Sequence, residues 1–278
     1  SQEGWCTLVG HRSMGMTLQI DLVGATSSPQ GTPNSRATSP RRAVDLTQPP
    51  GRDFRTRDAR LPPLEASRTH RVDLTVRERE LEVAPATTLA AMTYNGQFMG
   101  PVLQARLGDR MQVHLVNDGS MGHSIDFHAS RASPDTTMRT ISPGQSLDVE
   151  FTIDHAGIWL YHCSTMPMSA HIAAGMFGAL IVAPADLPTV DRQYVLVQSE
   201  TYLAEQNNQP VDTGKIADEK VDLTMFNGHA NQYLFAPLQA RVGERVRFWV
   251  LAAGPSRGMS FHIVGAQFDT CLLYTSPS

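Results

Sequence analysis

The chain of 278 residues has few cysteines and no long apolar segment. Its three cysteines, Cys6, Cys163 and Cys271, are an odd number at wide spacing, which argues against a disulfide framework. No run of about 18 apolar residues occurs, so the sequence predicts no membrane span. The net charge is −4, which excludes the strongly basic character that is typical of nucleic-acid binding.

Long stretches with the 3.6-residue period of a helix are also missing. Apolar and polar residues instead alternate with a period of two, which is typical of half-buried strands. Such runs lie at residues 72–76, 111–115 and 147–153, and Gly and Pro residues separate them. The composition, with 41% hydrophobic and 18% charged residues, suits a globular chain. We therefore predict an all-β fold.

A motif of eight residues occurs twice and predicts two similar domains. LQARLGDR at residues 103–110 returns as LQARVGER at residues 238–245, and an Asn-Gly pair precedes each copy. The offset of roughly 135 residues is close to the length of one β-sandwich domain. The sequence after the second copy is shorter than that after the first, so we expect the second domain to be truncated.

Composition suggests the other divisions of the chain. Residues 26–71 are rich in Pro, Ser, Thr and Arg and lack apolar periodicity, which predicts a linker. We expect one sandwich domain over residues 72–186 and an incomplete second one over residues 187–270. Residues 271–278 break off the preceding strand pattern abruptly, and we interpret them as a non-native tail.

Residue types that bind metals occur in order in the middle of the chain. Cys163, His171 and Met176 follow the spacing Cys-x7-His-x4-Met, and His123 lies upstream. A thiolate, two imidazoles and a weak axial thioether are the ligands of a blue-copper electron-transfer site. A single Cys or Met is more often an ordinary core residue, so the prediction depends on the whole ordered set. Met168 is a rival axial ligand, but Met176 fits the spacing better.

Two further histidines, His128 and His162, can share a second copper. Neighbouring side chains of a strand point to opposite faces, so His162 faces away from the site of Cys163. His123 and His128 are an odd number of residues apart, which again favours opposite faces. The peptide link between His162 and Cys163 would then join two metals by a short path for electrons. The alternative is that one of the two is a hydrogen-bonded core histidine.

These segments resemble those of the copper-containing nitrite reductases. MGHSIDFHAS at 121–130, YHC at 161–163 and HIAAGMFG at 171–178 are similar to the segments that hold the family's copper ligands. The resemblance implies tandem cupredoxin domains, which are Greek-key β-sandwiches, with type 1 and type 2 copper. The type 1 ligands implied are His123, Cys163, His171 and Met176, and the type 2 ligands are His128 and His162.

The resemblance also implies that Asp126 and His262 are catalytic. SFHIVGAQFD at 260–269 is similar to the family segment with an active-site histidine. Both residues would deliver protons while nitrite is reduced to nitric oxide. Alternatively, Asp126 only orients His128, and His262 is a core histidine. The family further implies a homotrimer whose type 2 copper lies between subunits, with a third histidine that we expect beyond the end of this sequence.

The first 25 residues contain another series of this kind. Cys6, His11 and Met16 follow the spacing Cys-x4-His-x4-Met and precede an alternating run, TLQIDLV. Residues 1–25 are similar to the last ligand loop of plastocyanin-like proteins, so we predict the remnant of a separate blue-copper domain. Such a domain, tethered by the linker, would be an electron donor at high effective concentration.

Two other functions stay open. A laccase-like multicopper oxidase reduces dioxygen at a trinuclear copper cluster, which usually shows His-x-His and His-Cys-His motifs. Here Asp126 and Ser164 stand where those motifs carry another histidine. A non-catalytic carrier with type 1 copper alone would not need His128 and His162. Because copper enzymes of this kind are usually periplasmic or secreted, we expect the same location for this protein.

Overall fold

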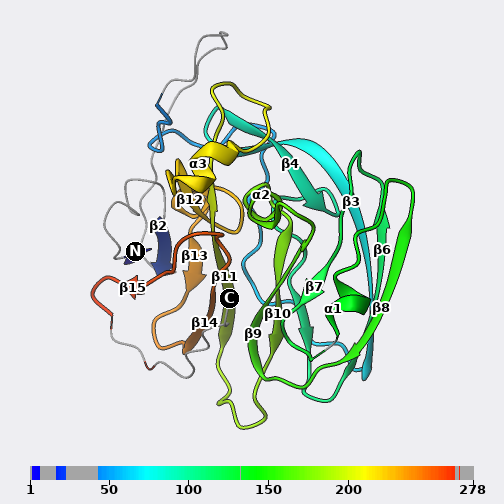
Figure 1. Cartoon of the computed structure of the whole chain (residues 1–278). Helices are drawn as coiled ribbons and strands as arrows, with labels where there is room; N and C mark the ends of the chain where they lie inside the picture. Colours follow the sequence, from blue (N-terminus) through cyan, green and yellow to red (C-terminus); the bar gives the residue numbers. More distant parts are fainter. Residues whose placement is uncertain (1, 7–16, 23–42, 132, 267–268, 270–278) are drawn as a thin grey trace.

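The computed structural model describes residues 2–6, 17–22, 43–131, 133–266 and 269 (Figure 1). In this part of the chain, strands form the framework and the four helices have only four to six residues each. The all-β prediction is therefore confirmed. Among the same residues, no helix has both the length and the apolar character to cross a lipid bilayer.

The first domain is a sandwich of two four-stranded sheets. One sheet has the order β4-β3-β6-β8, and its strands are β3 (Thr69–Ala84), β4 (Thr87–Tyr94), β6 (Arg110–Asn117) and β8 (Ser146–Thr152). The other has the order β5-β10-β9-β7, and its strands are β5 (Leu103–Ala105), β7 (Asp126–Phe127), β9 (Gly157–His162) and β10 (Phe177–Val182). In β8, buried and exposed residues alternate, as the sequence predicts for a strand with one face on a core.

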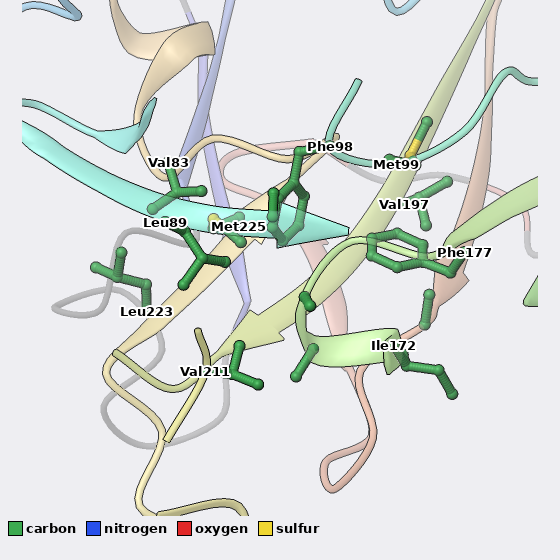
Figure 2. Close-up of a cluster of buried hydrophobic side chains, with 14 of the residues drawn as sticks. Val83, Leu89, Phe98, Met99, Ile172, Phe177, Val197, Val211, Leu223 and Met225 are labelled. Carbon is green, nitrogen blue, oxygen red and sulfur yellow. The ribbon is translucent and has the colours of Figure 1, made fainter. Parts of the chain in front are cut away.

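Strand β10 separates two hydrophobic cores and is buried along its whole length. Leu180 and Val182 face the core inside the first sandwich. Phe177, Ala179 and Ile181 face a second core, which the first domain shares with the second (Figure 2). A strand covered on both faces must be apolar at every position, which explains the sequence FGALIV.

The second domain follows β10 and contains the second copy of the repeated motif. One sheet has the order β12-β11-β14, and its strands are β11 (Arg192–Thr201), β12 (Leu223–Phe226) and β14 (Val246–Ala252). Another has the order β13-β2-β1-β15, and its strands are β1 (Gln2–Cys6), β2 (Thr17–Leu22), β13 (Leu238–Ala240) and β15 (Phe261–Ile263). Because β1 and β2 pair with strands of the second domain, this arrangement differs from the separate N-terminal domain that the sequence predicts.

The described part of the predicted linker, residues 43–71, also differs from the prediction. Its backbone is mostly irregular, but Val44, Leu46 and Leu61 pack against the shared core. Ala59 is buried, and strand β3 already begins at Thr69. The polar, Pro-rich composition correctly predicts irregular backbone, but contacts with distant residues hold this segment against the body.

Candidate metal centre

The first candidate site lies at one end of the first sandwich, where β9 and β10 leave their sheet. His162 is paired with Phe177 across these antiparallel strands. Cys163, which follows His162, and Met176, which precedes Phe177, therefore lie opposite each other just beyond the last strand pair. The Cys163 amide donates a hydrogen bond to the carbonyl of Met176 at 3.0 Å. His171 lies between them in the helix α2 (Met168–Ala173). Strand pairing therefore brings three of the four predicted type 1 ligands together.

The fourth predicted ligand, His123, comes from the segment before β7. It is held by a bridge to Ile141, with hydrogen bonds in both directions at 3.1 and 2.8 Å. The Sγ atom of Cys163 lies 3.3 Å from Nδ1 of His171 and 4.0 Å from Nδ1 of His123. All four side chains, that of Met176 included, are buried. Met168, the rival axial ligand, is 39% exposed at the start of α2, so the structure favours Met176.

The electrostatic environment of the first site suits metal binding. Burial, with a smaller contribution from His123, lowers the pKa of His171 to about 4. Burial also lowers the pKa of His123, against an opposing effect of Glu78. Both imidazoles are therefore neutral at pH 7, which is the form that binds metal. The amide of Ser124 approaches Sγ of Cys163 at 3.4 Å and can stabilise a thiolate. Buried nitrogen and thiolate donors of this kind fit a blue-copper ion.

The second candidate site lies on the opposite side of β9. Asp126 pairs with His162 across β7 and β9, and His128 follows directly after β7. Nε2 of His128 lies 3.0 Å from Nε2 of His162 and 3.6 Å from Oδ2 of Asp126. Burial and the neighbouring His162 lower the pKa of His128, against an opposing effect of Asp126. The three side chains form a group with one ligand atom from each, so the structure brings these predicted residues together.

The tautomer of His162 supports metal binding at this second site. Its Nδ1–H donates to the carbonyl of Cys163 at 2.9 Å, so a neutral ring carries its lone pair on Nε2. That lone pair points to His128, whose Nε2 is only 3.0 Å away. Two nitrogens at this distance need a proton or a cation between them. The side chains of His128 and Asp126 are 23% and 17% exposed, so this second site is partly accessible to solvent.

The structure does not bring His262 to this group. Among the described residues, the candidate metal-binding group contains Asp126, His128 and His162 but not His262. His262 lies in β15, which pairs with β1, and Figure 1 shows β15 at the left edge of the molecule, well apart from β7. Of the predicted N-terminal ligands, Cys6 ends β1, while His11 and Met16 lie outside the described residues, as does the proposed tail 271–278.

Two residues near the sites were missed by sequence reasoning. Glu78 in β3 lies 3.5 Å from Nε2 of His123, although 45 positions separate them along the chain. No local pattern signals such a contact, because it depends on the packing of distant strands. Ser124 accepts hydrogen bonds from the amide of Ser164 at 3.1 Å and from the hydroxyl of Thr165 at 3.0 Å. The only hint in the sequence that Ser124 lies near the site is its position directly after His123.

The strand framework and the Cys–His–Met set define a copper protein with cupredoxin domains. A family model described as "Multicopper oxidase" matches residues 75–186. A solved copper nitrite reductase from Nitrosomonas europaea has a TM-score of 0.61 and 35% identity, over 68% of this chain and 69% of that chain. The chain belongs to the family of copper-containing nitrite reductases, and its cofactor is copper.

Curated relatives agree with this assignment. The copper-containing nitrite reductase of Neisseria gonorrhoeae is 32% identical over 208 residues, which are 72% of this chain and 53% of that protein. The one of Alcaligenes xylosoxydans xylosoxydans is 29% identical over 256 residues, which are 83% of this chain and 76% of that protein. The chain therefore spans about half the length of the Neisseria relative that it matches.

Proposed function

We propose that this protein reduces nitrite to nitric oxide. Nitrite takes up one electron and two protons and releases water along with nitric oxide. The observation that carries this proposal is the back-to-back arrangement of two donor clusters, joined by the dipeptide His162–Cys163. One cluster is buried and the other is partly exposed, as an electron-transfer site and a substrate site require.

The two clusters would hold different copper ions. His123, Cys163, His171 and Met176 would hold type 1 copper, and His128 and His162 would hold type 2 copper. Copper in these sites supplies one-electron transfer at the first and a Lewis acid for nitrite at the second. Burial of the four type 1 side chains excludes substrate from that site. The hydrogen bond from Nδ1 of His162 keeps its Nε2 free as a ligand.

Asp126 is the proton donor that the geometry favours. Its carboxyl group lies 3.6 Å from Nε2 of His128, and its side chain is 17% exposed. It can thus reach both water and a substrate held beside His128, as a general acid must. The hydroxyl of Thr137 donates to its Oδ1 at 3.5 Å and limits its orientation.

The second predicted proton donor, His262, would act from another copy of the chain. Within one chain it lies in a different sheet from Asp126 and outside the group that Asp126 forms with His128 and His162. We infer a homotrimer, the assembly that the family resemblance implies, in which a neighbouring subunit completes the site. The sequence similarity to copper-containing nitrite reductases supports this inference.

Two further parts of the proposal concern the surroundings of the enzyme. An electron donor must reduce type 1 copper. We place the protein in the periplasm or outside the cell, where copper enzymes of this kind usually work.

Nitric oxide release is the test. The copper-loaded protein is given nitrite and a reduced donor, and nitric oxide and dioxygen uptake are followed in the same preparation. We expect nitric oxide that depends on nitrite. A blue protein that is inert towards nitrite would overturn the proposal; dioxygen uptake would then indicate a multicopper oxidase, and inertness towards both an electron carrier.

A further inference from the structure

Residues 44–60, called the strap below, run ahead of β3 and are anchored on the second domain. The side-chain amide of Asn231 donates to the carbonyls of Leu46 and Gln48, both at 2.8 Å. The ring of Phe54 packs on that of His229 with centroids 4.1 Å apart. These contacts join the strap to residues that follow it by more than 170 positions, so the strap has one defined place in the fold.

Arg57 links the strap to the first domain. Its guanidinium donates from Nη1 to the carbonyl of Met99 and from Nη2 to that of Gly100, both at 2.7 Å. Its backbone amide donates to Oε1 of Gln232 at 2.8 Å, and its carbonyl accepts from the hydroxyl of Tyr233 at 3.0 Å. Arg57 therefore holds a turn of the first domain and a segment of the second at once.

The same turn also binds Gly175 and Phe177, the two residues that flank Met176. The amide of Met99 donates to the carbonyl of Gly175 at 3.2 Å, and the amide of Gly100 donates to that of Phe177 at 2.7 Å. Arg57 binds the carbonyl groups of Met99 and Gly100, and their amide groups bind the ligand loop. Only one residue thus stands between the guanidinium and each neighbour of the axial ligand.

Packing makes this connection stiff. A Cβ atom on Gly175 would lie 3.1 Å from the ring of Phe98, and one on Gly228 would lie 2.7 Å from the carbonyl of Phe98. Phe98 is therefore clamped between the ligand loop and the second domain, and its side chain fills the shared core beside Met99 (Figure 2). In a core packed this closely, a displacement of the turn 97–100 also displaces the ligand loop that packs against it.

We propose that Arg57 is a positioning residue for the axial ligand Met176. Its forked guanidinium fixes the turn 97–100, and the turn fixes the backbone of residues 175–177. The inference rests on the proposed type 1 copper site. Because the axial ligand tunes the properties of a blue-copper ion, a change at Arg57 should reach the copper without touching it.

The test compares Arg57→Gln with Arg55→Gln in the copper-loaded protein, without nitrite. Arg55 is an exposed residue of the same strap, and among the described residues its guanidinium donates only to the carbonyls of Arg52 and Phe54. The readouts are the visible and EPR spectra, the reduction potential and the retention of copper against a chelator. We expect altered spectra, a shifted potential and roughly tenfold weaker copper retention for Arg57→Gln, because hydrogen bonds from a charged group are lost. Arg55→Gln should leave all four unchanged.

Two more variants refine the result. Arg57→Lys keeps the charge but cannot serve both carbonyls with a planar fork, so it should restore the spectra only in part. Tyr233→Phe removes the hydrogen bond to the carbonyl of Arg57 and the one that the Tyr233 hydroxyl accepts from Nδ2 of Asn227 at 2.7 Å, and it leaves the guanidinium of Arg57 in place. It should therefore give a smaller change in the same direction. If Arg57→Gln fails to fold, Tyr233→Phe decides the question.

Spectra that stay like those of the wild type in a less stable Arg57→Gln protein would overturn the inference, since Arg57 would then only support the fold. Full rescue by Arg57→Lys would also overturn it, since charge alone would be responsible. These outcomes are independent of nitrite turnover. A blue protein that is inert towards nitrite would reject the proposed function, yet it would still report whether Arg57 positions Met176.

Discussion

The two clusters of candidate metal ligands differ in burial, although two adjacent residues, His162 at the end of β9 and Cys163 directly after it, supply part of each. Cys163 and its partners are shielded from solvent, and His171 is only 4% exposed. On the other side of the strand, the side chain of His128 is 23% exposed beside a carboxylate. The alternation of side chains along a strand thus separates a shielded cluster from a partly exposed one, as the proposed electron-transfer and substrate sites require.

We expect the largest effect from a substitution of Cys163, which belongs both to the buried cluster and to the dipeptide His162–Cys163. Cys163→Ser removes the thiolate that makes the copper blue and the path to His162. We expect loss of the blue absorption and of nitrite turnover, measured by spectroscopy and by nitric oxide release. Copper at the second site should remain, because His128 and His162 are untouched. A Cys163→Ser protein that stays blue would contradict the assignment of the buried site.

A smaller effect is expected at the exposed cluster. Asp126→Asn keeps the shape of the side chain and removes its ability to release a proton. General acids contribute at least about 100-fold to rate, so turnover should fall by roughly that factor. The blue spectrum and the copper content serve as internal controls and should not change. Unaltered turnover would exclude Asp126 as the proton donor.

The pH dependence of stability in the metal-free protein tests the burial of the first cluster. The pKa of His171 is lowered from 6.5 to about 4, so its contribution to stability is complete above pH 6.5 and is lost as the pH falls towards 4. In that interval this group alone should lower the free energy of unfolding by up to about 1.4 kcal/mol per pH unit. Urea unfolding at about pH 7 and about pH 5 measures the slope.

Two controls belong to the pH experiment. His171→Asn should flatten the slope, because the buried imidazole is then absent. Bound copper should also flatten the slope, because ligation keeps the imidazole neutral. An equal slope for the wild type and His171→Asn would show that burial at the first site does not govern its titration.

The smallest effect is expected at the rival axial ligand. Met168→Leu changes a side chain that is 39% exposed and should leave the blue spectrum unchanged. Met176→Leu, the same replacement at a buried position, should shift the spectrum and the reduction potential. A spectral shift for Met168→Leu without one for Met176→Leu would reverse the assignment.

The arrangement of the ligands follows from the sequence where local rules apply. Cys163 and His162 face opposite ways because they are neighbours at the end of a strand, and Met176 lies beside Cys163 because β9 and β10 are adjacent strands. The family assignment and the all-β fold were also readable from the motifs. The assignment of individual ligands stays a prediction until copper is bound to the protein.

Features that depend on long-range packing were not readable in this way. A segment rich in Pro, Ser and Arg has the composition of a linker, but Asn231 and Tyr233, far along the chain, order residues 44–60. The contact between Glu78 and His123 likewise depends on how distant strands pack. Composition describes a segment's own preferences, and tertiary hydrogen bonds can override them.

The most direct test of the account is nitric oxide release by the copper-loaded protein and by its His128→Ala variant. Both should be blue and should accept an electron from a reduced donor, because the buried site is the same. The account predicts that the wild type converts nitrite to nitric oxide and that His128→Ala does not. Equal nitric oxide release by the two proteins would contradict the division of labour between the buried and the exposed cluster.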